Sequence, residues 1–140
     1  MDKKKILILN GVNLSCLGTR EVDIYGSENF QDYIAFLKSK YPMVELSYQQ
    51  TNSLDVLVTM IENHKNFDGI ILNPGAYTHT AIVIADAIKA SPVPVVEVHI
   101  SNLFGREQYR KNSLISASCK GFIAGFGLKG YELALSSFLN

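Results

Sequence analysis

Two residues that could exchange a proton lie two positions apart in an apolar run. Glu97 and His99 belong to residues 94–100, whose composition predicts a buried strand, and alternate residues of a strand point to the same face. A carboxylate beside an imidazole selects its tautomer and stabilises its protonated form, which suits an acid or a base. Two alternatives stay open: a structural His–Glu pair, and a zinc site completed by His79, because zinc needs at least three protein ligands.

A second polar segment, Asn-Pro-Gly-Ala-Tyr-Thr-His-Thr at residues 73–80, follows the apolar run 69–72. The run predicts a buried parallel strand, and Asn-Pro-Gly predicts a sharp turn at its carboxyl end. Thr78 and Thr80 are candidate caps for a helix at residues 80–90. Ligands of open α/β sheets bind at the carboxyl ends of strands, so this segment is either a binding turn or an ordinary strand–helix connection.

Arg106 and Arg110 are four residues apart and would share one face of a short helix within residues 102–112. Such a pair suits a carboxylate ligand, because each guanidinium group binds a carboxylate with two hydrogen bonds. The alternative is a solvated helix face on which the arginines pair with Glu107. The spacing alone favours this alternative.

Arg20 and Tyr25 lie in a long loop, residues 11–26. We expect residues 18–26 of this loop to act as a lid. For Tyr25 to serve as a base near neutrality, its pKa must fall by about 3 units from about 10. One cation about 4 Å away, at an effective dielectric constant of about 20, supplies roughly that much. The alternative is a tyrosine that anchors the loop to the core.

The elements that must position these residues alternate along the chain. Apolar or alternating runs predict five strands, at residues 5–10, 44–50, 69–72, 94–100 and 121–125. Helical spacing and capping residues predict four helices: 27–41 with Ser27 as its cap, one capped by Asn52 or Ser53, 80–90 and 128–139. This alternation predicts a flavodoxin-like three-layer α/β sandwich, with a five-stranded parallel sheet of order 2-1-3-4-5 and helices on both faces. The first loop, the 73–80 turn and the end of the fourth strand would then meet.

Length and composition restrict the function classes. With 140 residues, 47% hydrophobic and 19% charged, the chain is expected to form one domain, 1–140. Thirteen basic residues balance thirteen acidic ones, so no broad patch for nucleic acid or membrane is expected. No apolar run approaches a membrane span, and the start does not resemble a signal peptide. Cys16 and Cys119 have neither metal-ligand spacing nor a disulfide framework, which predicts a cytoplasmic protein with reduced thiols.

The combined motifs resemble the type II 3-dehydroquinate dehydratases (type II dehydroquinases). The likeness spans essentially the whole chain in one register and rests on Leu9-Asn-Gly-x-Asn13, Leu17-Gly-Thr-Arg-Glu21, Ile24-Tyr-Gly26, residues 73–80, Glu97-Val-His-Ile-Ser-Asn102, Arg106-Glu-x-x-Arg110 with Ser113, and Gly125-Phe-Gly-x-x-Gly-Tyr131. The resemblance implies a cofactor-free, metal-free anti elimination of water from 3-dehydroquinate through an enolate. The product is 3-dehydroshikimate, and the reaction is the third step of the shikimate pathway.

The resemblance also implies a role for each matching residue. Tyr25 would be the base, with Arg20 lowering its pKa; Asn13 would hold the enolate oxygen through a water; and His99, oriented by Glu97, would protonate the departing hydroxyl. The remaining matches are substrate-binding positions: Asn73, His79, Ile100, Ser101 and Arg110, with Arg106 in support and Asp86 completing the site of a neighbouring subunit. Trimers arranged into a homododecamer are expected.

The chain departs from the family pattern at four places that hold no proposed catalytic residue: Val12 for Pro, Ser15-Cys16 for Asn-Leu, Leu54-Asp55 for Glu-Gly and Lys111-Asn112 for a His pair. Three other functions would need different residues. A non-catalytic flavodoxin-like binding module needs none of the paired residues, and a metal-dependent hydrolase would use His79, His99 and Glu97. A Schiff-base dehydratase would need a lysine in the site, where none is expected.

Overall fold

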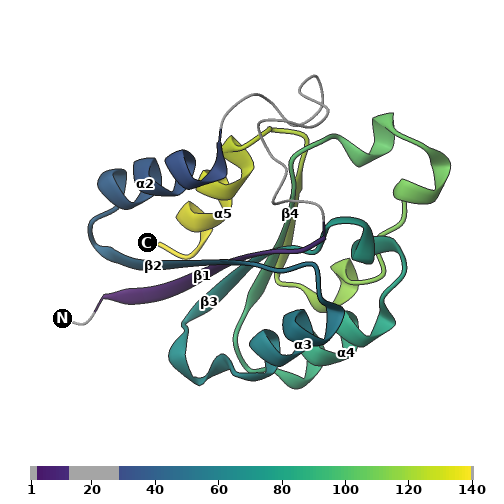
Figure 1. Cartoon of the computed structure of the whole chain (residues 1–140), viewed down its shortest axis with the longest axis horizontal. Coiled ribbons are helices and arrows are strands. Elements are labelled where there is room, and N and C mark those ends of the chain that lie inside the picture. Colours follow the sequence, from purple (N-terminus) through teal and green to yellow (C-terminus); the bar gives the residue numbers. More distant parts are fainter. Residues whose placement is uncertain (1–2, 13–28, 140) are drawn as a thin grey trace.

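The computed structural model describes residues 3–12 and 29–139 and shows helices on both faces of one parallel sheet (Figure 1). Its strands are β1 (Lys4–Asn10), β2 (Val44–Gln50), β3 (Gly69–Asn73), β4 (Val95–His99) and β5 (Gly121–Ala124). Their order is β2-β1-β3-β4-β5, and each neighbouring pair is parallel. The predicted flavodoxin-like order is therefore confirmed, with β2 and β5 as the edge strands.

Two pairs of helices cover the sheet. They are α2 (Phe30–Lys40), α3 (Leu54–Glu62), α4 (Ile82–Ala90) and α5 (Lys129–Ser137). Helices α2 and α5 lie over one face, and α3 and α4 lie over the other (Figure 1). A hydrophobic core lies on each face of the sheet, and strand β1 contributes side chains to both. Ile6 and Ile8 pack with α2 and α5, whereas Leu7 and Leu9 pack with α3 and α4. This alternation follows from the two-residue period of a strand.

The turns that follow β1 and β3 touch through their backbones. The Gly11 N–H donates to the Asn73 carbonyl at 2.7 Å, and a Cβ at position 11 would lie 2.4 Å from the Pro74 oxygen. Gly75 has a φ of +65°, and a Cβ there would lie 2.5 Å from the Val12 oxygen. Only glycine permits these two approaches, so Asn-Gly and Asn-Pro-Gly hold the strand ends together.

Helix caps agree with prediction in one case and differ in two. Ser53 caps α3, since its hydroxyl accepts from the Val56 N–H at 3.2 Å. Helix α2 begins at Phe30 with Asn29 as its cap, later than predicted, and Ser27 lies outside the described residues. The capping of α4 by Thr78 or Thr80 is wrong.

The start of α4 differs because a 3-10 helix, Gly75–His79, takes up the preceding residues. The N–H groups of Thr80 and Ala81 both bond to the Tyr77 carbonyl, and α4 begins at Ile82 without a side-chain cap. The chain thus satisfies these donors through a tighter turn instead of a threonine hydroxyl.

Residues 102–112 form two 3-10 helices, Leu103–Gly105 and Gln108–Arg110, and not the predicted single helix. Asn102 caps the first one, and extended backbone at Arg106 and Glu107 separates them. Arg106 and Arg110 therefore do not share a helix face. Within the described residues, no helix combines the length and the apolar character that crossing a bilayer requires.

Candidate active site

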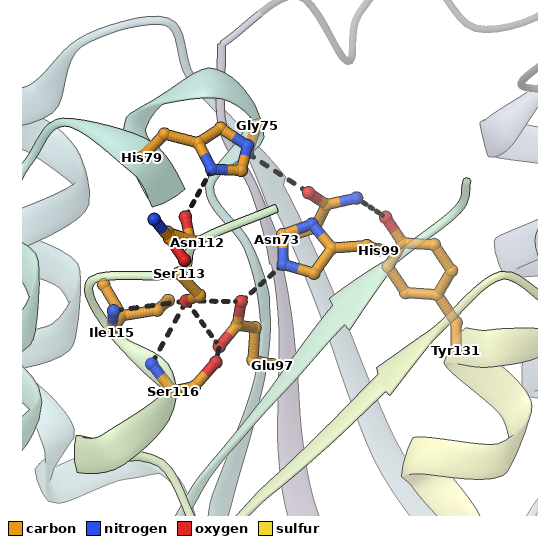
Figure 2. Close-up of polar contacts among 10 residues, drawn as sticks. All are labelled: Asn73, Gly75, His79, Glu97, His99, Asn112, Ser113, Ile115, Ser116 and Tyr131. Atoms are coloured by element: carbon orange, nitrogen blue, oxygen red, sulfur yellow. Dashed lines mark hydrogen bonds and ion pairs between the residues drawn. The ribbon is translucent and has the colours of Figure 1, made fainter. Parts of the chain in front are cut away.

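Glu97 and His99 contact each other at the carboxyl end of β4, as their spacing predicted. The His99 Nε2 atom is hydrogen-bonded to the Glu97 carboxylate (Figure 2). Glu97 is fully buried and His99 is 5% exposed, so the pair is shielded from water. An acid–base pair in a water-poor site exerts a stronger electrostatic effect than the same pair in solution.

Two serines from the segment before β5 hold the buried carboxylate. Ser113 Oγ lies 3.1 Å from Glu97 Oε1 and 2.9 Å from Oε2, and Ser116 Oγ lies 2.6 Å from Oε1. Figure 2 shows both hydroxyl groups converging on Glu97 from the side opposite the His99 contact. A buried carboxylate needs such donors, because burial without them is strongly unfavourable.

The same segment also holds His79. The Nδ1 atom of His79 lies 2.7 Å from the Asn112 carbonyl, and the Leu114 N–H donates to the Thr78 carbonyl at 2.9 Å. A carbonyl only accepts, so the hydrogen of His79 lies on Nδ1 and its Nε2 atom remains an acceptor when the ring is neutral. His79 is partly exposed at the end of its 3-10 helix, where a ligand could reach it.

Asn73 and Asn10 end the adjacent strands β3 and β1 and are joined through Tyr131 of α5. The Asn73 amide donates to the Tyr131 hydroxyl at 2.9 Å, and that hydroxyl donates to Asn10 Oδ1 at 2.8 Å. Asn73 Oδ1 also accepts from the Gly75 N–H at 3.1 Å. Burial raises the pKa of Tyr131 well above its ordinary value, so its hydroxyl stays neutral and serves as a structural link.

The turn after β4 carries Ile100, Ser101 and the two arginines. The Ile100 carbonyl accepts from the Gly127 N–H at 3.0 Å, which ties this turn to the segment after β5. Arg106 donates to Ser101 Oγ at 3.3 Å, and Arg110 Nε lies 2.9 Å from Glu107.

The pairing with Glu107, the alternative that the spacing favoured, is present. A hydrogen bond from its own backbone and the charges of Arg110 and Arg106 hold the pKa of Glu107 below its ordinary value. Two guanidinium groups thus face one ionised carboxylate, and a net positive charge remains for an anionic ligand.

The structure does not join Asp86 to these residues. It lies exposed on α4, and no hydrogen bond or ion pair connects it to the Glu97–His99 cluster within residues 3–12 and 29–139. Ile82 and Val83 on the same helix are 65% and 49% exposed. The predicted residues Asn13, Arg20 and Tyr25, and the predicted lid at 18–26, lie outside the described residues.

The metal alternative lacks its ligand set in the part of the chain that is described. No three histidine, cysteine or acidic residues there are grouped as a metal site would require. Cys119 lies close to Glu97, and burial, together with that carboxylate, raises the pKa of its thiol to about 12. A neutral thiol is a poor metal ligand and a poor nucleophile.

Nothing in the sequence points to Ser116, and Ser113 stands out only as part of a motif. The two serines lie 16 and 19 residues after Glu97, and no periodic pattern links positions that far apart. The sequence places Asn10 at a strand end and in the Leu9-Asn-Gly-x-Asn13 motif, but it does not indicate the buried hydrogen bond of its amide with Tyr131. The tyrosine appeared in the Gly-x-x-Gly-Tyr motif, but its partners could not be read from it.

Comparison with known proteins finds matches that span nearly the whole chain. The family model described as dehydroquinase class II matches residues 4–139. The chain is 47% identical over 136 residues to a 3-dehydroquinate dehydratase of Caldicellulosiruptor saccharolyticus, covering 94% of each chain. The type II dehydroquinase of Propionibacterium acnes superposes with a TM-score of 0.92 at 41% identity, covering 98% of this chain and 97% of the other. That of Butyrivibrio crossotus superposes with a TM-score of 0.91 at 36% identity, covering 99% of each chain.

Proposed function

The chain belongs to the dehydroquinase class II family, and on this premise we propose that its site catalyses the dehydration of 3-dehydroquinate to 3-dehydroshikimate. The enzyme is a hydro-lyase of the shikimate pathway, which leads to chorismate and the aromatic amino acids. Among the described residues, the buried Glu97–His99 pair is the observation that carries the proposal. The match to residues 4–139 supports treating 1–140 as one catalytic domain.

The elimination needs a base on one face of the substrate and an acid on the other. Tyr25, activated by Arg20, removes the proton beside the ketone, and the electron pair moves to the ketone oxygen as an enolate. Asn13 holds this oxygen through a water. When the enolate collapses, the carbon–oxygen bond breaks and His99 gives its proton to the departing hydroxyl, which leaves as water. The positions of these residues in the family motifs support the roles.

Substrate binding is assigned to residues around His99. Asn73, His79, Ile100, Ser101 and Arg110 contact the substrate, and Arg106 supports them. The proposal is supported by the hydrogen bonds that tie Asn73 to the turn after β3, His79 to the segment holding Glu97, and Arg106 to Ser101. The net positive charge around Glu107 favours the substrate carboxylate.

No cofactor or metal is required by this mechanism, because the ketone itself accepts the electron pair of the broken C–H bond. We place the enzyme in the cytoplasm, where its thiols stay reduced, and we assign it no nucleic-acid or membrane partner.

A homododecamer built from trimers is the proposed assembly, with Asp86 completing the site of a neighbouring subunit. The exposed Ile82 and Val83 beside Asp86 support this, since a lone subunit would leave both in water. Light scattering coupled to gel filtration should give twelve times the 15.5 kDa mass of one chain. Ile82→Asp should give smaller species with lower activity, whereas a monomeric, fully active wild type would contradict the assignment.

The direct test adds purified protein to 3-dehydroquinate in the presence of EDTA and follows the ultraviolet absorbance of the conjugated product. Wild type should turn over, whereas Tyr25→Phe and Arg20→Ala should be nearly inactive. No turnover by a folded wild-type protein would refute the enzymatic function. Activity in Tyr25→Phe would leave the reaction standing and refute the choice of base, and inhibition by EDTA would point to a metal.

A further inference from the structure

We propose that Ser113 and Ser116 are positioning residues that hold Glu97 as a hydrogen-bond acceptor and thereby keep the transferable proton of His99 on Nδ1. The link between this clamp and turnover rests on the proposed function, whereas the clamp itself concerns only the protonation pattern of His99. The inference is drawn from the donors and acceptors around a fully buried carboxylate.

The hydroxyl of Ser113 has one orientation that satisfies all its neighbours. Its oxygen accepts hydrogen bonds from the N–H groups of Ile115 at 3.2 Å and Ser116 at 3.1 Å. A serine hydroxyl has two acceptor positions and one hydrogen. Because both acceptor positions are used by the backbone, the hydrogen is directed at the Glu97 carboxylate (Figure 2).

Ser116 completes the arrangement from the next turn of chain. Its hydroxyl lies 2.6 Å from Glu97 Oε1, while Ser113 bridges both carboxylate oxygens. Cys119 also lies near this carboxylate, and its raised pKa keeps the thiol neutral. A carboxylate that receives two hydroxyl hydrogens acts as an acceptor towards its remaining partner.

That remaining partner is His99 Nε2, which must therefore carry a hydrogen. The Nδ1 atom is then the position that gains and loses the second proton, so it is the one available to a departing hydroxyl. His79 is held in the opposite way, with its hydrogen on Nδ1, by the Asn112 carbonyl. One segment, residues 112–116, thus sets the tautomers of both histidines.

The first experiment measures kcat and KM of Ser113→Ala, Ser116→Ala and the double variant. We expect kcat to fall about 10-fold for each single change and about 100-fold for both, the usual range for partners of a catalytic group. KM should stay within about 3-fold, because both hydroxyl groups bond to Glu97 and neither serine is a proposed substrate contact. Ser113→Thr, which keeps the hydroxyl, should retain most of the rate. Ser118→Ala is the matched control: it lies in the same 3-10 helix, Ser116–Ser118, and has no bond to Glu97 among the described residues.

A double-mutant cycle separates this role from a general loss of structure. In a His99→Asn background, removal of either serine should have no further effect on kcat, because the serines act through His99. An equal loss in both backgrounds, or unchanged kcat in the folded serine variants, would overturn the proposal. Ser116→Ala keeps the measurement decisive if Ser113→Ala does not fold, since Ser116 Oγ bonds only to Glu97 within the described residues.

The second experiment does not depend on turnover. The chain has three histidines, so magic-angle-spinning NMR of protein labelled with 15N-histidine can resolve each ring, and His99→Asn identifies the relevant signals. Neutral His99 should be protonated on Nε2 in the wild type and on a mixture of both nitrogens in the double-serine variant. Protonation on Nδ1 in the wild type, or an unchanged tautomer in the variant, would refute the clamp even if 3-dehydroquinate is converted. The expected spectra without any turnover would instead refute the proposed function alone.

Discussion

At the scale of single residues, the chemistry depends on a buried charge that has enough partners. Glu97 has no exposed surface, yet two hydroxyl groups and one imidazole surround its carboxylate. Charged groups inside proteins persist where hydrogen bonds replace water, and here the replacement comes from side chains with fixed directions. These contacts leave Glu97 as a fixed hydrogen-bond partner of His99.

Glu97→Gln tests this directly. The substitution preserves size but puts an amide where an acceptor-only group stood, so the His99 tautomer is no longer specified and the imidazolium loses its counter-charge. We expect kcat to fall by about 10²–10⁴, the range for losing general acid catalysis, with a smaller change in KM. Steady-state kinetics on 3-dehydroquinate check this, with the exposed Glu45→Gln on β2 as control; equal rates for both variants would contradict it.

Residue-scale prediction from the sequence succeeded where two partners share one element and failed where they do not. Glu97 and His99 were paired correctly, because a strand places every second residue on one face. Arg106 and Arg110 were placed on a helix face that does not exist, because extended backbone at Arg106 and Glu107 interrupts the segment. Propensity over eleven residues could not reveal that interruption.

At the scale of elements, α5 is tied to the carboxyl ends of β1 and β3, which lie at the candidate site. The Tyr131 hydroxyl bonds to Asn73 of β3 and Asn10 of β1, and its ring packs edge-on against Phe30 at a centroid distance of 4.9 Å. One side chain therefore sets the spacing of two strand ends and one helix.

Tyr131→Phe should lower the free energy of unfolding by about 1–3 kcal/mol, because both buried amides lose a hydrogen-bond partner while the ring packing remains. Urea unfolding of the variant and wild type checks this. Tyr41→Phe removes a hydroxyl that bonds to Glu132 in a less buried place and should cost less. A Tyr131→Phe protein as stable as wild type would show that the hydroxyl links nothing of consequence.

The contact between the turns after β1 and β3 predicts that an added side chain at Gly11 will destabilise the fold through a steric clash. In Gly11→Ala the new methyl group would lie 2.4 Å from the Pro74 oxygen, so one turn must move. We expect destabilisation of about 1–3 kcal/mol and lower activity, as in other overpacked sites. Gly121→Ala at the start of β5 has no atom within 4 Å and should be near neutral in the same thermal-unfolding assay. Comparable melting temperatures for both variants would argue against a close contact.

At the scale of the whole molecule, an ionic cluster outside the site joins the two helices of one layer. Lys40, at the end of α2, lies 2.6 Å from Glu132 of α5, and the Tyr41 hydroxyl donates to the same carboxylate at 2.7 Å. The hydrogen bond from Lys40, followed by that from Tyr41, lowers the pKa of Glu132. The hydrogen bond with Glu132 in turn raises the pKa of Lys40.

The directions of these two pKa shifts give the pH dependence of this ionic cluster. A lowered Glu132 pKa means that its contribution is present above the ordinary value of 4.5 and is lost as the pH falls through the folded value. A raised Lys40 pKa means that its contribution is present below 10.5 and is lost as the pH rises through the folded value. Glu132→Gln should thus lower the melting temperature slightly at pH 7, with the difference fading in acid and above pH 10.5. A difference that persists unchanged well below pH 4.5 would contradict the ionic origin.

The sheet order and both helical layers were predictable because alternating apolar strands and helices allow few right-handed arrangements. The strand-end positions of Asn73, Glu97 and His99 followed from that order. What could not be predicted were features set by contacts distant in the chain: the 3-10 helix that replaces a threonine cap before α4, the Tyr131 link and the serines on Glu97.

The measurement that tests the account most directly is kcat for 3-dehydroquinate in wild type and His99→Asn, side by side and with EDTA present. Asparagine keeps a polar side chain on β4 but cannot deliver the proton to the leaving hydroxyl. The account predicts turnover in wild type and a kcat lower by about 10²–10⁴ in the variant, with correct folding in both. No turnover in wild type, or equal turnover in the two proteins, would contradict it.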